Sequence, residues 1–179
     1  DMDAILGRDD RLIEKLSKAC EQISPAFTAI IGTPVPAVIA TDMRALKRMA
    51  EKKTGLPCIT AECTGTNYYD SGSEPVWIAH FKTIATASKP VQKGRHGIIG
   101  ATPLELSIIC PEKIVAEYKA KGWENVICYG MGSSLDDVKN AAAAEMNIVC
   151  SAAAIKAAEY LKEKFGTPYE IDYPHSCLP

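Results

Sequence analysis

The stretch Asn125–Cys150, with the sequence NVICYGMGSSLDDVKNAAAAEMNIVC, decides the fold class of this 179-residue chain. Two short apolar runs in it, Asn125–Tyr129 and Asn147–Cys150, have the length and composition of buried strands. The alanine-rich segment between them, Ser134–Glu145, is predicted to form a helix because alanine has the highest helix propensity. A strand, a helix and a second strand in this order indicate two parallel strands joined by a right-handed crossover.

The same alternation extends along the rest of the chain. Further strands are expected at residues 26–31, 57–61, 96–101 and 169–172, and helices over residues 8–23, 43–54, 75–87, 111–121 and 152–165. The pattern predicts an α/β fold of Rossmann-like parallel sheets flanked by helices. The polar segment Ser88–Arg95, broken by Pro90 and Gly94, is expected to be a linker. It would separate two Rossmann-like halves, residues 1–94 and 95–179, or join them within one packed unit.

Composition excludes several classes of protein. Hydrophobic residues make up 47% of the chain and charged residues 23%, values typical of a globular protein and not of a disordered chain, a collagen or a coiled-coil rod. The formal charge of −2 argues against a nucleic-acid partner. The uncharged stretch Ile23–Thr41 contains three prolines, and residues 1–20 lack the hydrophobic core of a signal peptide, so no membrane association is expected.

The seven cysteines do not form a disulfide framework, because their number is odd and no CxxC pair is present. Most of them lie in apolar runs, where a reduced cysteine behaves as a small buried hydrophobe. These features predict a reducing, cytoplasmic compartment. The abrupt start at Asp1 and end at Pro179 suggest a piece excised from a longer subunit.

Ligands of open parallel sheets bind beyond the carboxyl ends of the strands. Five loops lie at such ends: Gly32–Pro36, Cys63–Gly72, Thr102–Glu105, Gly130–Ser134 and Cys150–Ala152. In one of them, backbone N–H groups at Gly130, Gly132, Ser133 and Ser134 are candidates for binding an anionic cofactor. The competing interpretation is a helix capping box, formed by Ser133 with Asp136 or Ser134 with Asp137. The capping box is favoured, since the third glycine and the ribose-binding acid of a dinucleotide site are absent.

Two cysteines follow predicted strands directly. Cys150 precedes a helix N-terminus, where the helix dipole favours a thiolate that can act as a nucleophile or metal ligand. The alternative is a cysteine buried in the core. Cys63 occupies a similar position and is followed by Thr64 and Gly65, which are further candidates for cofactor binding. The spacing of Cys58 and Cys63 matches no zinc motif. For His80, His96 and His175, which are far apart, surface or capping roles are favoured, and no Ser-His-Asp nucleophile elbow is visible.

Several motifs resemble the nitrogenase component 1 family in the family's order. Residues 5–42, which include AIIGTPVPAVIATD, resemble the family's "FGG-x-x-x-L" helix and the strand and "T-C-x-x-x-I-I-G-D-D" loop that follow it. Residues 54–65, TGLPCITAECTG, are similar to "G-I-P-V-I-P-V-N-C-P-G", and residues 161–169, LKEKFGTPY, to "L-E-E-K-Y-G-I-P-Y". The resemblance covers nearly the whole chain and implies a nitrogenase component 1-like, chelatase-like α/β fold.

The resemblance also implies a function. Such proteins work as paired subunits that receive electrons from an ATP-dependent iron-protein reductase, with a metallocluster or tetrapyrrole between domains and an iron–sulfur cluster at the subunit interface. Cys150 corresponds to the cysteine that holds the catalytic cofactor, whereas the interface-cluster cysteine falls on Pro34. Thr41 replaces the first aspartate of the "D-D" pair, which marks a divergent branch.

The leading hypothesis is therefore a fragment of an oxidoreductase subunit in a homo- or hetero-oligomer, with Cys150 as metal ligand. The fragment is expected to be inactive alone. The main alternative is a non-catalytic cofactor-assembly scaffold or metal-chelate binding module on the same fold, which Pro34 favours. A nucleotide-binding domain is a third hypothesis, disfavoured by the missing fingerprint residues.

Overall fold

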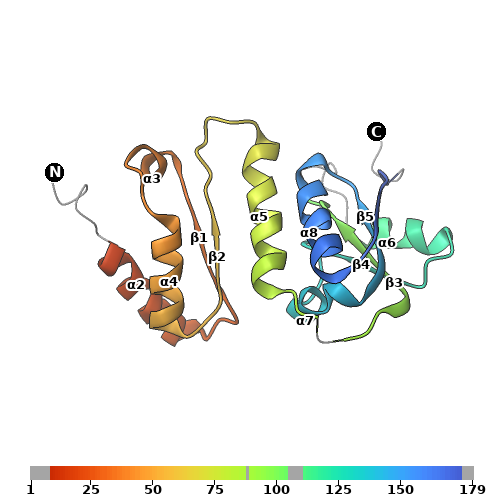
Figure 1. Ribbon diagram of the computed structural model, residues 1–179, viewed down its shortest axis with the longest axis horizontal. Coiled ribbons are helices and arrows are strands. Elements are labelled where there is room, and N and C mark those ends of the chain that lie inside the picture. The colour runs from red at the N-terminus through yellow and green to blue at the C-terminus, as the bar shows by residue number, and fades with distance from the viewer. Residues whose placement is uncertain (1–8, 88, 105–110, 175–179) are drawn as a thin grey trace. The chain divides into compact units, whose positions relative to one another are not determined.

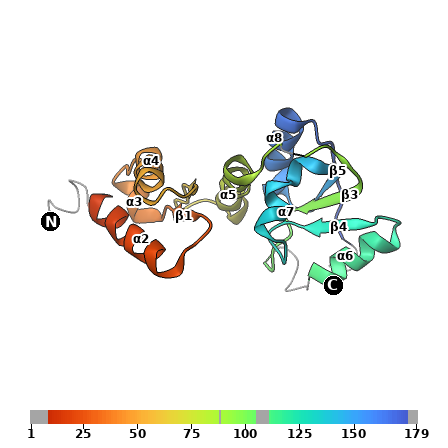
Figure 2. The same ribbon diagram turned by 90° about the horizontal axis from the view of Figure 1, so that it is seen from below.

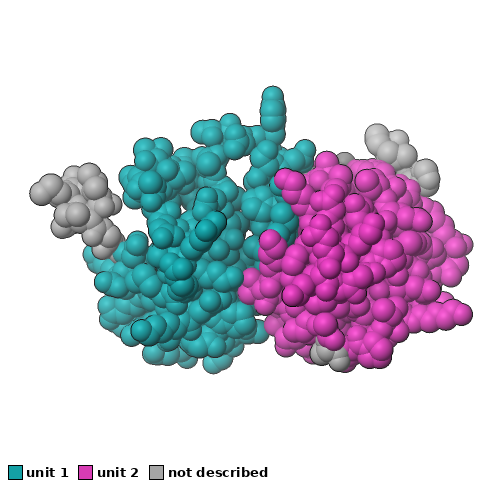
Figure 3. Space-filling model, in the orientation of Figure 1, with its two compact units in different colours: residues 1–79 teal, residues 80–179 magenta. Residues whose placement is uncertain are grey.

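The computed structural model describes residues 9–87, 89–104 and 111–174 of the chain. The chain divides into two compact units, residues 1–79 and 80–179. Figure 1 shows the elements and Figure 3 the two units in different colours. Each unit contains a parallel sheet with helices packed on it, which confirms the predicted α/β class. No helix in the described ranges is both long and apolar enough to span a membrane.

The first unit is built on a two-stranded parallel sheet of β1 and β2, in which Thr28 pairs with Cys58 and Ile31 with Ala61. Its elements are α2 (Asp9–Ile23), β1 (Thr28–Ile31), α3 (Pro34–Val38), α4 (Met43–Thr54) and β2 (Cys58–Ala61), followed by α5 (Tyr69–Ile84), which extends past the unit boundary at residue 79. Helices α2 and α4 pack together, and their core consists of Ile13, Met43, Leu46, Ala50 and Cys58.

Local capping chemistry sets the ends of α4. The Asp42 carboxylate accepts hydrogen bonds from the N–H groups of Arg44 and Ala45, each at 2.9 Å. Gly55 ends the helix in the left-handed conformation, with φ of 70°. The hydrogen bond from the Ala45 N–H is the main reason why the pKa of Asp42 lies below its ordinary value.

The second unit contains a four-stranded parallel sheet in the order β4-β3-β5-β6. Its elements after α5 are β3 (Gln92–Ile99), α6 (Pro111–Ala120), β4 (Asn125–Cys128), α7 (Leu135–Lys139), η1 (Ala141–Ala143), β5 (Ala144–Val149), η2 (Ala152–Ala154), α8 (Ile155–Phe165) and β6 (Tyr169–Ile171). Figures 1 and 2 show α6 on one face of the sheet and α8 on the other. The chain builds β4 on one side of β3 and β5 on the other, so the topological switch point lies between β3 and β5.

Two expectations were wrong in the first half of the chain. Gly32–Pro36 was expected to be a loop, but Pro34 begins the short helix α3, since a proline in the first turn lacks only an N–H that would have no helical partner. The helix expected to start at Pro75 begins at Tyr69, within the expected Glu62–Glu74 loop. There the Ser73 hydroxyl donates to the carbonyls of Tyr69 at 3.2 Å and Asp70 at 3.3 Å.

Two further expectations were wrong in the second half. The expected linker ends early, because β3 begins at Gln92, where the Gly94 N–H donates to the Glu145 carboxylate of the neighbouring strand at 2.6 Å. The helix expected over Ser134–Glu145 ends at Lys139, after which Asn140 donates its side-chain amide to the Asp136 carbonyl at 2.7 Å. The three alanines of η1 are buried, so tertiary packing overrides their helix propensity.

Candidate functional site

Cys150 lies at the topological switch point of the four-stranded sheet, directly after β5. Its backbone N–H donates to the Ile99 carbonyl at the end of β3 at 3.0 Å, and its thiol donates to the same oxygen at 3.3 Å. The residue is only 3% exposed. The sulfur is thus held where the carboxyl ends of two neighbouring strands meet, the position at which open α/β sheets bind ligands.

Gly100 allows this close approach. It adopts φ of 96°, and a Cβ there would lie 2.8 Å from the Ser151 Cβ and 2.9 Å from the Ala154 Cβ. Real Cβ atoms do not approach so closely, so only glycine lets the chain leaving β3 pack against the start of η2. Ser151 in turn caps η2 by accepting a hydrogen bond from the Ala153 N–H. The turn after Ile99 and the turn after Cys150 therefore form one packed unit.

The surroundings of the Cys150 thiol are mainly apolar. It belongs to a core cluster with Ile98, Ala101, Ile114, Tyr118, Val126, Cys128 and Ile148.

Tyr118 of this cluster has polar partners at its hydroxyl. The Tyr118 hydroxyl donates to the Asp172 carboxylate at 3.0 Å, and the Lys121 ammonium lies 3.1 Å from the same oxygen. Burial, the hydrogen bond to Asp172 and the nearby charge of Asp172 raise the pKa of Tyr118. Among the described residues, no group of three or more His, Cys, Asp or Glu side chains could hold a metal ion.

The Gly130–Ser134 loop follows β4 and contains the predicted capping box. Ser134 and Asp137 form it, with the Asp137 carboxylate accepting from the Ser134 N–H at 3.0 Å and the Ser134 hydroxyl receiving the Asp137 N–H at 3.1 Å. Gly130 and Gly132 are left-handed, with φ of 83° and 81°. Asp136 pairs instead with Lys139 at 3.2 Å. Since the cap uses the Ser134 N–H, this donor is not directed at a ligand in the described arrangement.

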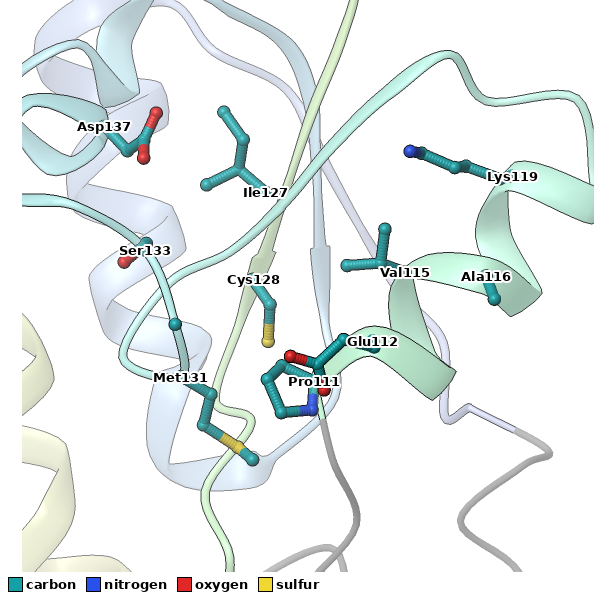
Figure 4. A pocket seen from close by; sticks show the side chains of 11 residues that line it. Pro111, Glu112, Val115, Ala116, Lys119, Ile127, Cys128, Met131, Ser133 and Asp137 are labelled. Carbon is teal, nitrogen blue, oxygen red and sulfur yellow. The ribbon is translucent and has the colours of Figure 1, made fainter.

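A pocket of about 430 Å³ lies beside this loop (Figure 4). In the figure, Ser133 and Asp137 lie on one side and the α6 residues Val115, Ala116 and Lys119 on the other, with the Cys128 thiol between them. The lining residues are Pro111, Glu112, Val115, Ala116, Lys119, Ile127, Cys128, Met131, Gly132, Ser133 and Asp137. The sequence interpretation included Gly132 and Ser133 but missed the α6 residues, because nothing in a helix sequence shows which strand end it faces.

Cys63, Thr64 and Gly65 lie in the first unit, after β2. The Gly32 N–H donates to the Ala61 carbonyl at 2.8 Å, which brings the ends of β1 and β2 together. A Cβ on Gly65, whose φ is 72°, would lie 2.6 Å from Pro34 Cγ, so this loop packs on the start of α3. The Cys63 thiol, partly exposed, donates to the Gly72 carbonyl at 3.5 Å. The structure thus brings Gly65 together with Pro34 inside the first unit.

The described histidines have local partners or buried surroundings. His96 Nδ1 lies 3.0 Å from the Gly94 carbonyl, and its ring centroid is 3.8 Å from that of Trp123. Burial lowers the pKa of His80. The remaining candidates His175 and Glu105 lie outside the described residues.

Comparisons with known proteins agree with this architecture. A family model described as nitrogenase component 1 type oxidoreductase matches residues 1–175. The chain belongs to this family.

Its similar relatives include two proteins named nitrogenase iron-molybdenum cofactor biosynthesis protein NifE. The one from Klebsiella pneumoniae is 25% identical over 184 aligned positions, covering 94% of this chain and 39% of the relative. The one from Clostridium pasteurianum is 26% identical over 170 positions, covering 93% of this chain and 36% of the relative. The chain therefore spans well under half the length of these relatives.

Solved structures support the same fold. Nitrogenase Cp1 at pH 6.5 matches with a TM-score of 0.79 and 19% identity, covering 97% of this chain and 34% of that one. Nitrogenase Cp1 at pH 5 matches with a TM-score of 0.78 at the same identity, covering 95% and 34%. At this identity the likeness concerns the fold, and it confirms the predicted family architecture.

Proposed function

We propose that this chain is part of a NifE-like subunit that holds an iron–sulfur metallocluster during cofactor assembly, with Cys150 as a metal ligand. The observation that carries the proposal is the similarity to two NifE proteins over 93–94% of this chain. The burial of Cys150 at the β3–β5 switch point supports it, because that position combines a ligand-binding location with exclusion of water.

The chemistry of Cys150 suits an iron–sulfur ligand. Thiolates are the usual ligands of such clusters. On ligation the thiol would lose its proton and with it the hydrogen bond to the Ile99 carbonyl. One thiolate does not complete a cluster site, and the described residues contain no larger ligand group. The other ligands are therefore assigned to the rest of the longer subunit or to a paired subunit.

The candidate loops of each unit would contribute to cofactor binding. We assign Gly130, Gly132, Ser133 and Ser134 to cofactor binding in the second unit, and Cys63, Thr64 and Gly65 to cofactor binding in the first unit. The Gly130–Ser134 loop is suited to this role because its glycines leave the backbone accessible beside the pocket. A bound metallocluster would supply the redox and sulfur chemistry, while these residues would bind it, orient it and exclude water.

Pro34 favours assembly over catalysis. The family resemblance places the interface-cluster cysteine at this position, and proline provides no thiolate. A subunit that lacks this ligand loses one route for electrons from an iron-protein partner. The second candidate function, a catalytic oxidoreductase subunit supplied by an ATP-dependent iron protein, is favoured by the family description itself.

The test is the iron and acid-labile sulfide content of the full-length protein, purified without oxygen after co-expression with its gene neighbours. Cys150→Ala is compared with Cys58→Ala, a matched control that removes another buried thiol from the core of the first unit. Iron lost only from Cys150→Ala would support the proposal. Iron retained equally in both variants, or absent from the native protein, would refute it.

A second measurement separates the two candidate functions. An assembly subunit should transfer its iron and sulfide to an apo acceptor protein without ATP-dependent turnover. A catalytic subunit should keep its metal and consume electrons from an iron protein only when ATP is present. Metal retention combined with ATP-dependent electron uptake would replace the assembly proposal with the catalytic one.

A further inference from the structure

We propose that Arg95 is a positioning residue that holds the Gly130–Ser134 loop in place beside its pocket, acting on the end of the loop through Asp137. The role of the loop in holding a cofactor rests on the proposed function. The control of the loop by Arg95 follows from contacts within the second unit and stands independently.

The contact of Arg95 is with the end of the loop. Arg95 comes from β3, and its side chain is 10% exposed. Its Nη2 donates to the Asp137 carbonyl at 3.4 Å and lies 3.5 Å from Asp137 Oδ1. The other carboxylate oxygen, Oδ2, lies 2.7 Å from the Ser134 hydroxyl and 3.0 Å from the Ser134 N–H. Asp137 thus connects the central strand of the sheet to the last residue of the loop.

The start of the loop is fixed by the core and the sheet. Tyr129 is fully buried and immediately precedes Gly130, and its N–H donates to the Ile98 carbonyl at 2.9 Å. Its ring packs edge-on against Phe81, with centroids 5.4 Å apart. Burial raises the pKa of Tyr129 to about 12, and the nearby Arg95 charge opposes this increase. The core and the β3 backbone thus fix Tyr129 at the start of the loop, whereas the Arg95 guanidinium contacts Asp137 beyond its end.

The loop needs such support because its own backbone provides little. Gly130 and Gly132 occupy left-handed conformations that glycine leaves easily, since it has no Cβ to restrict it. The short helix α7 that follows is only five residues long. A planar guanidinium with several donors can contact a carbonyl and a carboxylate together, which a lysine ammonium does with less geometric precision. These properties explain an arginine at this position of a central strand.

Cys128 reports on the position of the loop. It lines the pocket together with Gly132 and Ser133, and it is 3% exposed. If the loop moves away, the Cys128 sulfur becomes accessible from the pocket side. The alkylation rate of this thiol therefore measures loop opening without any bound cofactor.

The experiment uses the full chain with Arg95→Gln, Arg95→Lys, Asp137→Asn and the control Asp136→Asn. Asp136 lies on the same helix but points to solvent, with its side chain 80% exposed and paired to Lys139. N-ethylmaleimide labelling of Cys128 is followed by peptide mass spectrometry, with Cys58 as internal reference, since it is buried in the other unit.

We expect Cys128 to react about tenfold faster in Arg95→Gln and Asp137→Asn, the size expected when a buried polar partner is removed. The Cys128 alkylation rate of Arg95→Lys should lie between the rates of these variants and that of the native chain. The rate of Asp136→Asn should equal that of the native chain. Unchanged Cys128 reactivity in Arg95→Gln would overturn the proposal. A parallel rise at Cys58 would also overturn it, since that would indicate general destabilisation. Neither result depends on iron content, so failure here is distinct from failure of the proposed function.

Discussion

Cys63 and Cys150 occupy equivalent positions in the sequence, each just after a parallel strand, but their surroundings differ. Cys63 follows β2 in a two-stranded sheet and is partly exposed, with its thiol donating to the Gly72 carbonyl at 3.5 Å. Cys150 follows β5, which has β3 on one side and β6 on the other, and it is buried in a core cluster. The position of a strand within its sheet, and not the local sequence, decides the environment of the thiol that follows it.

The largest expected effect concerns the close packing that buries Cys150. Gly100→Ala should lower the free energy of unfolding by about 3 kcal/mol, because the new Cβ meets Ser151 and Ala154 in addition to the strain of a positive φ. Denaturant unfolding of the full chain measures this.

Gly122 provides a matched control for backbone strain. It has φ of 94°, close to that of Gly100, but a Cβ there would meet nothing within 4 Å. Gly122→Ala should therefore cost only about 1 kcal/mol. If Gly100→Ala and Gly122→Ala lower the free energy of unfolding equally, backbone strain alone, and not packing at the switch point, makes Gly100 necessary.

The second prediction compares the two thiols directly. Cys63 should react with N-ethylmaleimide about tenfold faster than Cys150 in the native chain, because the Cys150 sulfur requires local opening before it can react. Peptide mass spectrometry after a short labelling time gives both rates from one sample. In denaturant the two rates should become similar, and a persistent difference there would mean that sequence context, not burial, controls reactivity.

The third prediction concerns the capping box beside the pocket. Ser134→Ala should lower the free energy of unfolding by about 1 kcal/mol, the usual cost of losing an N-cap hydroxyl. Ser133→Ala is the matched control, because the neighbouring hydroxyl lines the pocket without capping α7. Thermal or denaturant unfolding measures the stability of both variants against the native chain. A similar loss in Ser133→Ala would contradict the assignment of Ser134 as the capping residue.

The sequence predicted features that depend on neighbouring residues and missed those that depend on distant ones. The Ser134–Asp137 capping box was predicted because its two partners lie within a few residues of each other. The shortened helix before Ala141 was not predicted, because it results from burial against the rest of the unit.

The same rule applies to the candidate site. That Cys150 follows a strand could be predicted from its apolar run, but its contact with the Ile99 carbonyl depends on the order of strands in the sheet. The Arg95–Asp137 interaction joins residues 42 positions apart in the chain, and no local pattern marks either of them as a partner of the other. Charges of opposite sign are too common in the sequence to identify such a pair.

The smallest expected effect is a dependence of stability on pH that should differ in origin between the two units. The pKa of Asp42 is lowered mainly by the Ala45 N–H. In Asp137, burial acts in the opposite direction, and hydrogen bonds from Ser134 together with the Arg95 charge lower the pKa overall. Because each folded-state pKa lies below the ordinary value of 3.8, both carboxylates stabilise the fold above that pH and lose this contribution as the pH falls through their folded-state values.

The Arg95→Gln substitution should change the pKa of one of these two carboxylates and leave that of the other unchanged. It should raise the pKa of Asp137, measured by NMR titration of the carboxyl carbon, because an opposite charge is removed. The pKa of Asp42 should not change, since its causes are the local N–H groups and the charges of Arg48 and Arg44. A shift at Asp42 of the same size would mean that the substitution perturbs the chain as a whole. An unchanged Asp137 would mean that Ser134 alone holds its carboxylate, and the loop would then depend on its own capping box without support from the sheet.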